Sequence, residues 1–118
     1  MAKEMDRIWA ARLLERWINF YGMDDADAWP REDYGFVKES CEAMRLAVGL
    51  LRGDEARPGV NIKKAASVLE RWPKVHSMDN PEFWESEDFP FVKNALEAVQ
   101  FAASFLKQYR VTTKRIEP

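Results

Sequence analysis

At 118 residues and a formal net charge of −2, the chain is as long as one domain, and it carries no overall field that would attract nucleic acid or an anionic membrane. Its apolar fraction of 47% and charged fraction of 32% are typical of a globular protein that buries one core without a metal or disulfide. The single cysteine, Cys41, excludes an intramolecular disulfide and is typical of a reducing compartment, and no stretch is as long as a membrane span. We therefore predict one soluble cytoplasmic domain, 1–118.

The first predicted element is an amphipathic helix that ends near residue 21. Its apolar residues recur at spacings of three and four, which places them on one face of a helix. Asp6 is suited to cap the first turn, and Gly22 is suited to end the helix. The expected buried stripe consists of Trp9, Ala10, Leu13, Leu14, Trp17, Phe20 and Tyr21.

The second predicted helix begins after Asp33, whose carboxylate could cap the free N–H groups of the first turn. Gly53 provides its end. The segment before this helix has about eleven residues, which is long for a connection in a helical bundle, so it needs an anchor of its own. Trp29 is the expected anchor, and a short helical turn is expected near 25–29. The expected buried stripe consists of Phe36, Val37, Ser40, Cys41, Met44, Ala47, Val48 and Leu51.

The third predicted helix follows a linker at 53–60 and runs from Ile62 to Trp72. Asn61 is suited to cap its start. Pro73 lacks an N–H and clashes with the preceding turn, so we expect it to end or kink this helix. The connection that follows contains Asn80 and then Pro81, the pattern of a cap with proline at the first helical position, which predicts a short helical turn at 81–85.

The fourth predicted helix begins after Asp88, with Pro90 in its first turn, where a missing N–H costs nothing. Gln108 offers no stop signal, so the helix is expected to run to Arg110, followed by a tail at 111–118. Trp84 is the expected anchor of the loop before it. The expected buried stripe consists of Phe91, Val92, Ala95, Leu96, Val99, Ala102, Ala103 and Leu106.

An internal repeat relates the two halves of the chain. When residues 10–52 are aligned without a gap on 65–107, an offset of 55 residues, 18 of the 43 positions are identical. We name residues 6–52 the first unit and residues 61–110 the second unit. Two copies are too few for an open solenoid. The pattern therefore predicts an all-α four-helix bundle of two tandem αα units, related by a pseudo-two-fold axis.

The residues that could carry catalysis or bind a metal are sparse. His76 is the only histidine, which excludes the Glu-x-x-His pairs of a di-iron bundle, and closing the third helix is its expected role. Cys41 lies on an apolar stripe and is matched by Leu96 in the other unit, which favours packing over nucleophilic catalysis. The acidic cluster Asp24, Asp25 and Asp27 lacks the spacing of an EF-hand loop. We predict no catalytic residue, no cofactor and no metal site.

Polar residues that both units retain are the remaining candidates for a site. The Glu-Arg-Trp triplets place Glu15 and Arg16, and likewise Glu70 and Arg71, beside a buried tryptophan edge. A guanidinium there could stack on an aromatic ring or bind a carboxylate, and Glu42 and Glu97 are the expected partners. An intramolecular buttress is favoured over a ligand site. The candidate residues for partner or ligand binding are Arg16, Arg71, Glu15, Glu70, Trp29 and Trp84.

Three functions are compatible with these patterns, and no motif identifies an activity. A non-enzymatic protein-interaction module, such as a regulator, adaptor or assembly factor, is favoured because aromatic and arginine side chains dominate interface energies. It would bind a protein partner or self-associate. The alternative is a ligand-binding or enzymatic pocket between the units, lined by Trp, Arg and Glu. The third is nucleic-acid contact through the basic tail that begins at Lys107, which four cations on an acidic chain support weakly.

Overall fold

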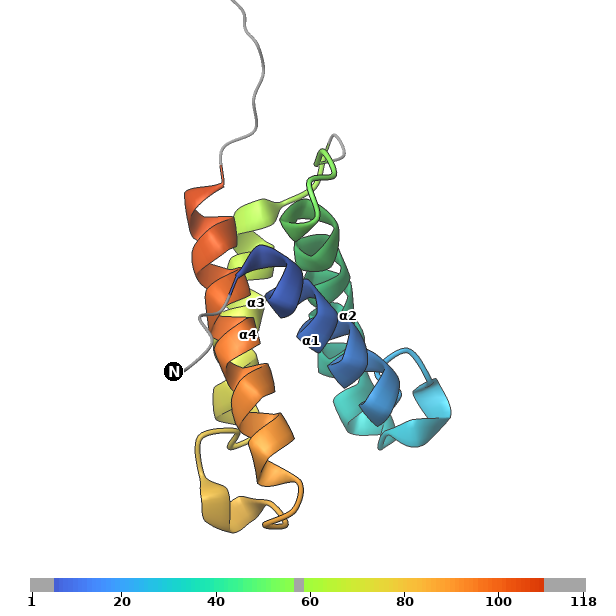
Figure 1. Cartoon of the computed structure of the whole chain (residues 1–118). Coiled ribbons are helices and arrows are strands. Elements are labelled where there is room, and N and C mark those ends of the chain that lie inside the picture. Colours follow the sequence, from blue (N-terminus) through green and yellow to red (C-terminus); the bar gives the residue numbers. More distant parts are fainter. Residues whose placement is uncertain (1–5, 57–58, 110–118) are drawn as a thin grey trace, which may run out of the picture.

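The computed structural model describes residues 6–56 and 59–109, and these form four α-helices and no strand. The helices are α1 (Arg7–Tyr21), α2 (Arg31–Leu51), α3 (Ile62–Val75) and α4 (Phe89–Gln108), as Figure 1 shows. Short 3₁₀ turns, η1 (Ala26–Ala28) and η2 (Pro81–Phe83), lie in the α1–α2 and α3–α4 connections. The predicted all-α class and both predicted helical turns are confirmed.

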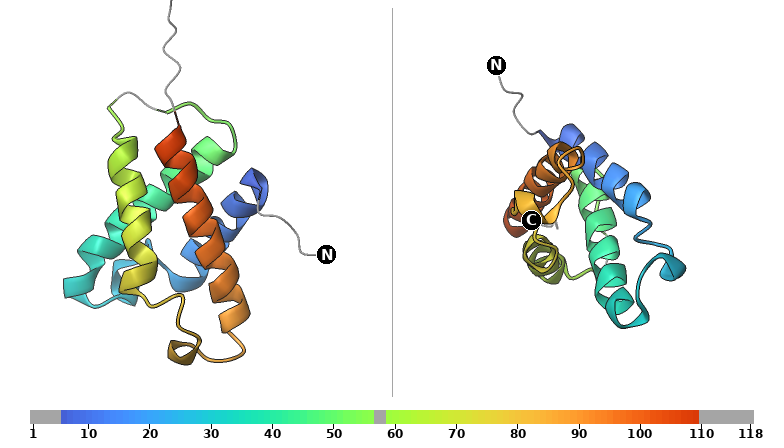
Figure 2. Two further views of the ribbon diagram at one scale, coloured as in Figure 1. Left: turned by 90° about the vertical axis from the view of Figure 1, so that its left-hand side faces the viewer. Right: turned by 90° about the horizontal axis from the view of Figure 1, so that it is seen from below.

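The helices pack as two neighbouring pairs. α1 lies against α2, and α3 lies against α4, while α1 also packs on α4 and α3 on α2. Figure 2 shows that the α3–α4 pair crosses the α1–α2 pair at an angle. All four helices contribute to one apolar cluster, whose largest fully buried side chains include Trp17 and Trp72. This packing is compatible with a helical bundle.

The buried face of α1 differs from the predicted stripe, which included Phe20 and omitted Ala11 and Ile18. Phe20 was expected to be buried, but 66% of its surface is exposed, whereas Ile18 is 1% exposed. Ile18 lies one turn after the buried Leu14, so it continues the buried face. Phe20 lies one turn after the exposed Arg16 and belongs to the outer face. The prediction for Phe20 was therefore wrong.

Three of the five predicted N-caps act through their side chains, and one of them is Asn80, which accepts the Glu82 N–H at 3.1 Å at the start of η2. The Asp6 carboxylate accepts the Trp9 N–H at 2.7 Å, and the Asn61 side chain accepts the Lys64 N–H at 2.9 Å. The prediction for Asp33 was wrong, because α2 begins at Arg31 and places Asp33 in its first turn. A carboxylate there still interacts favourably with the helix dipole. Asp88 is the N-cap residue of α4, but its side chain makes no capping hydrogen bond.

Of the two predicted effects of Pro73, ending the helix was wrong, because α3 continues to Val75, and a kink stays a prediction. Proline removes one N–H donor, and the helix resumes beyond it with the His76 N–H donating to the Trp72 carbonyl oxygen at 3.1 Å. The Pro73 ring is itself buried in the core. At the other end of the second unit, α4 ends at Gln108, and the predicted extension to Arg110 lies outside the described residues.

The chain leaves α1 and α3 through the same unusual backbone conformation. Gly22 follows α1 with φ +58°, and Ser77, at the matched position of the repeat, has φ +52°. This left-handed region suits glycine, but a serine side chain is strained there. Gly22 ends α1 as predicted, and the second unit keeps the same turn with a less suitable residue.

Candidate functional site

The two Glu-Arg-Trp triplets lie on α1 and α3, and each directs its members to different surroundings. The tryptophans are buried in the core, with Trp17 2% and Trp72 1% exposed. The arginines of the triplets are exposed on the outer side of the same helices. A helical spacing of one residue turns the side chain by about 100°, which is why neighbours in sequence separate in this way.

Each of these arginines contacts the other unit. The Arg16 guanidinium lies over the Phe91 ring at 5.5 Å from its centroid, and Arg71 lies over Phe36 at 5.2 Å. Both distances are typical of cation–π contacts. Arg16 and Phe91 come from α1 and α4, while Arg71 and Phe36 come from α3 and α2. The predicted stacking of both guanidinium groups therefore occurs, and it joins the first unit to the second.

The prediction that Glu42 and Glu97 are the carboxylate partners of the arginines was wrong. Arg71 pairs with Glu39 at 3.7 Å rather than with Glu42. Position 94 of the second unit, which matches Glu39, is an asparagine, so Arg16 lacks the matched carboxylate. Glu39 differs between the units, so the pattern of shared residues does not reveal it as the partner.

The glutamates of the triplets make ion pairs within their own units. Glu15 on α1 accepts two hydrogen bonds from Arg52, one of them at 2.7 Å, in a bidentate pair. Glu70 on α3 forms the matched pair with Lys107 near the end of α4. These contacts connect the first helix of each unit to the end of its second helix, and they are the buttresses favoured by the sequence. Exposed pairs of this kind contribute little to stability.

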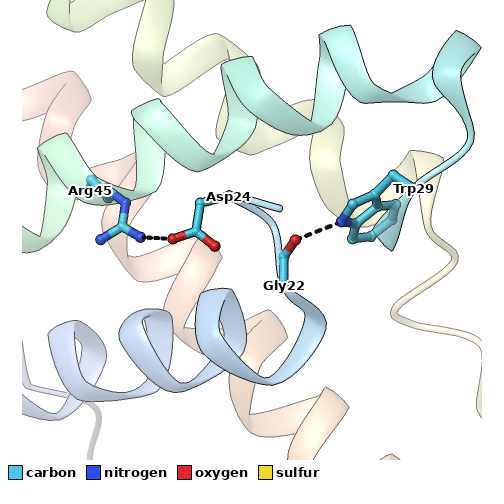
Figure 3. Close-up of polar contacts among 4 residues, drawn as sticks. All are labelled: Gly22, Asp24, Trp29 and Arg45. Carbon is cyan, nitrogen blue, oxygen red and sulfur yellow. Dashed lines mark hydrogen bonds and ion pairs between the residues drawn. The ribbon is translucent and has the colours of Figure 1, made fainter. Parts of the chain in front are cut away.

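Trp29 and Trp84 hold the loops that follow α1 and α3. The Trp29 indole N–H donates to the Gly22 carbonyl oxygen at 3.0 Å, and the Trp84 indole N–H donates to Ser77 at 2.9 Å. Figure 3 shows the Trp29 bond closing its loop. Each half-buried ring also contacts the central tryptophan of the other unit, Trp72 or Trp17. Both residues therefore act as the predicted loop anchors.

Two aromatic clusters result, and we name them after their central residues. The Trp17 cluster contains Trp17, Tyr21, Trp84 and Phe91, and the Trp72 cluster contains Trp72, His76, Trp29 and Phe36. The Trp17–Phe91 and Trp72–Phe36 centroid distances are both 5.7 Å. In each cluster two rings come from one unit and two from the other.

The clusters differ in their titratable member. Burial lowers the pKa of His76, although the nearby Asp33 opposes this shift. Burial raises the pKa of Tyr21, and the charge of Asp88 adds to that effect. Both residues therefore favour the neutral form, as expected for a group with little access to water. His76 also closes α3 through its backbone N–H, the role that the sequence favours for it.

A groove of about 490 Å³ lies beside the Trp17 cluster, where α1 meets the start of α4. Phe20 and Phe91 form its apolar part, with their ring centroids 5.6 Å apart and their planes at 73° in an edge-to-face contact. Polar side chains complete its lining: Arg16, Asn19, Glu87 and Asp88. Among the six predicted candidates only Arg16 reaches this groove, and no tryptophan lines it. The sequence missed Phe20 because its place in the apolar spacing suggested burial.

The other residues that the sequence offered as candidates for chemistry have structural roles. Cys41 is 4% exposed in the core, and burial raises the pKa of its thiol. Asp25 caps η1 through a hydrogen bond from the Asp27 N–H at 3.0 Å. Within 6–56 and 59–109, no group of three His, Cys, Asp or Glu side chains is arranged to hold a metal ion. In the same part of the chain, no helix is long and apolar enough to cross a membrane.

Comparisons with family models, with curated proteins and with solved structures found no match for this chain.

Proposed function

We propose that this protein is a non-enzymatic protein-interaction module that binds its partner through the groove between α1 and α4. The observation that carries the proposal is Phe20, a large aromatic side chain that is 66% exposed on the wall of that groove. Aromatic side chains with an arginine beside them are typical of the residues that dominate binding energy. The regulator, adaptor or assembly roles that we propose all require such a surface, and we propose a cytoplasmic location for the protein.

The scaffold that we propose for this surface is two αα units related by a pseudo-two-fold axis. Contacts that recur at an offset of 55 residues support it. The Arg16–Phe91 contact has its counterpart in Arg71–Phe36, and Trp17–Trp84 has its counterpart in Trp72–Trp29. In both cases the roles of the units are exchanged, as in an isologous interface. A fused pair of this kind would offer one surface in two diverged copies.

The divergence favours the Phe20 side as the binding surface. Val75 occupies the position that matches Phe20, and Ala28 occupies the position that matches Phe83. Phe83 is 64% exposed, so the loop before α4 adds a second exposed ring that the loop before α2 lacks. Burying one such ring at an interface removes far more apolar surface from water than burying an alanine.

The charges around the groove indicate what the partner carries. Glu87 and Asp88 line the groove, and no lysine or arginine of 6–56 or 59–109 forms an ion pair with either carboxylate. Arg16 is held over Phe91 on the same wall. The surface therefore fits a partner segment that places an apolar side chain against Phe20 and a cationic side chain beside Glu87 and Asp88.

The test compares Phe20→Ser with Val75→Ser, a matched control at the same place in the repeat. Tagged protein is crosslinked in cells of its source, and partners are quantified by mass spectrometry. Purified partner is then titrated by calorimetry. We expect Phe20→Ser to weaken binding by about tenfold or more and Val75→Ser to leave it within about twofold.

Equal effects of the two substitutions would contradict the proposal, as would a partner whose affinity does not depend on Phe20. Glu87→Lys tests the contribution of the groove's negative charge separately from that of Phe20. We expect this variant to bind the partner more weakly and with less dependence on salt. If the crosslinked partner is a second copy of the chain, the same variants should shift the oligomeric state in sedimentation experiments.

A small-ligand role is the second candidate, because the groove has the volume of a ligand site and contains convergent polar groups. It predicts that a small molecule, rather than a protein, copurifies with wild type and is lost from Phe20→Ser. Nucleic-acid contact through the basic tail remains a third proposal, and residues 110–118 of that tail lie outside the described residues. It predicts salt-sensitive binding that disappears when 107–118 are removed.

A further inference from the structure

One ion pair of the first unit has no counterpart in the second. Arg45 on α2 donates from Nη2 to Oδ2 of Asp24 at 2.9 Å, linking the helix to the loop after α1 (Figure 3). In the second unit Asp79 matches Asp24, but Gln100 replaces Arg45. A glutamine amide carries no charge and is shorter than an arginine, so it cannot reproduce this pair.

A groove of about 480 Å³ lies at that place in the second unit, between α3 and α4. Both Asp79 and Gln100 line it. Its apolar lining consists of Leu69, Pro73, Leu96 and Ala103, and its remaining lining is polar: Glu70, Lys74 and Ser104.

The position of Arg45 indicates what this groove can hold. Arg45 follows Cys41 by one turn of α2, so the two side chains are neighbours on one face of the helix. Cys41 matches Leu96, which is part of the lining of the second-unit groove. In the first unit an arginine paired with a carboxylate therefore lies beside the position that, in the second unit, lines the groove. An arginine stem lies well on apolar side chains while its head pairs with a carboxylate.

We propose that the groove between α3 and α4 binds a guanidinium group, supplied by an arginine side chain of a partner peptide, with Asp79 as the pairing carboxylate. Glu70 is already paired with Lys107, which leaves Asp79 as the carboxylate that faces the groove without an ion-pair partner among the described residues. Gln100 supplies an amide oxygen as a second acceptor. The site is separate from the Phe20 groove, and only the peptide source of the arginine rests on the proposed interaction function.

Lys74 opposes a bound cation and provides a further check. It lines the groove, whereas the matched position of the first unit is the neutral Asn19. A guanidinium ligand therefore predicts that Lys74→Gln strengthens binding. An anionic ligand predicts the opposite, since it would lose its cation.

The experiment titrates the full chain with acetyl-Ala-Arg-Ala-amide and follows backbone amide shifts by NMR. The control peptide carries citrulline, which has the shape of arginine without its charge. We expect arginine-specific shifts at Asp79 and Gln100, and an affinity that falls by about fivefold or more in Asp79→Asn. Free arginine is titrated in parallel, and tighter binding of free arginine than of the peptide would overturn the peptide source.

Two exchange variants use the repeat as its own control. Gln100→Arg should provide the second unit with an internal ligand and abolish peptide binding while the melting temperature stays the same or rises. Arg45→Gln should open the first unit, so that the peptide also shifts the amide of Asp24. Equal binding of the citrulline peptide, or undiminished binding to Asp79→Asn or Gln100→Arg, would overturn the proposal. Failure of the Phe20→Ser test alone would leave these shifts unchanged and would refute only the α1–α4 interface.

Discussion

The Trp17 and Trp72 clusters are built alike but border different surfaces. Each has a buried tryptophan, a phenylalanine from the other unit at 5.7 Å and an arginine over that phenylalanine. Beside the Trp17 cluster Phe20 is 66% exposed, while the matched Val75 beside the Trp72 cluster is 60% exposed. The exposed fraction is similar, but the phenylalanine presents a much larger aromatic surface. The two units therefore share the aromatic and arginine contacts of the clusters and differ in the side chain that each cluster exposes at its border.

Truncation of the central tryptophans should have the largest effect on stability. Trp17→Ala and Trp72→Ala each remove a fully buried ring from a packed core, so we expect each to lower the free energy of unfolding by about 3–5 kcal/mol. Urea unfolding followed by circular dichroism measures both values. If either alanine variant does not fold, Trp17→Phe and Trp72→Phe give the same comparison. A cost below about 1 kcal/mol at one site alone would show that the clusters do not support the fold equally.

Exchanging the residues that follow α1 and α3, Gly22 and Ser77, should change the free energy of unfolding by an intermediate amount, with opposite sign in the two units. Ser77 has φ +52° and Gly22 has φ +58°, a region in which an L side chain is strained. We expect Ser77→Gly to raise the free energy of unfolding by about 1 kcal/mol and Gly22→Ser to lower it by a similar amount. A Cβ at Gly22 would meet Ala28 Cβ at an ordinary 3.5 Å, so backbone strain is the expected cause. A destabilised Ser77→Gly would contradict this account.

His76 and Tyr21, the titratable members of the two clusters, should make stability depend on pH in different ranges. Burial lowers the pKa of His76 in the folded state, so the unfolded chain binds the proton more readily. Stability should therefore be greatest above the ordinary histidine pKa of 6.5 and decline as the pH falls through the folded value. His76→Tyr, which copies the first unit, should remove that part of the pH dependence. Urea unfolding of wild type and His76→Tyr at neutral and mildly acidic pH measures the two free energies of unfolding. If the gap between the two proteins is the same at both pH values, the expected contribution of His76 is refuted.

The alkaline side should show the matching effect for Tyr21. Burial, with the charge of Asp88, raises the pKa of Tyr21, so its neutral form is favoured in the folded protein. This contribution is fully present below pH 10, the ordinary tyrosine value, and is lost as the pH rises through the folded pKa. We expect Tyr21→Phe to lose less stability than wild type at alkaline pH. Ultraviolet titration of the phenolate offers an independent measurement, and an ordinary pKa there would contradict the burial of this side chain.

Local sequence patterns predicted the helices and most of their buried faces. Asp6, Asn61 and Gly22 lie where their capping chemistry placed them, because a cap depends on residues within one turn. The predicted end of α3 at Trp72 was wrong, because the helix continues past Pro73, whose ring is buried, to Val75. The predicted burial of Phe20 was wrong, because a phenylalanine at the border of an apolar stripe can be buried or exposed, depending on the tertiary packing.

The sequence by itself determined the helical periods and the similarity between residues 10–52 and 65–107. Only the tertiary structure decided that Arg16 packs on Phe91 of the other unit, that Arg71 pairs with Glu39, and that grooves lie beside Phe20 and Asp79. Periodicity is a property of a single helix, so a single sequence reveals it. The crossing of two helix pairs depends on side chains far apart in the chain, and one apolar stripe is compatible with several crossings.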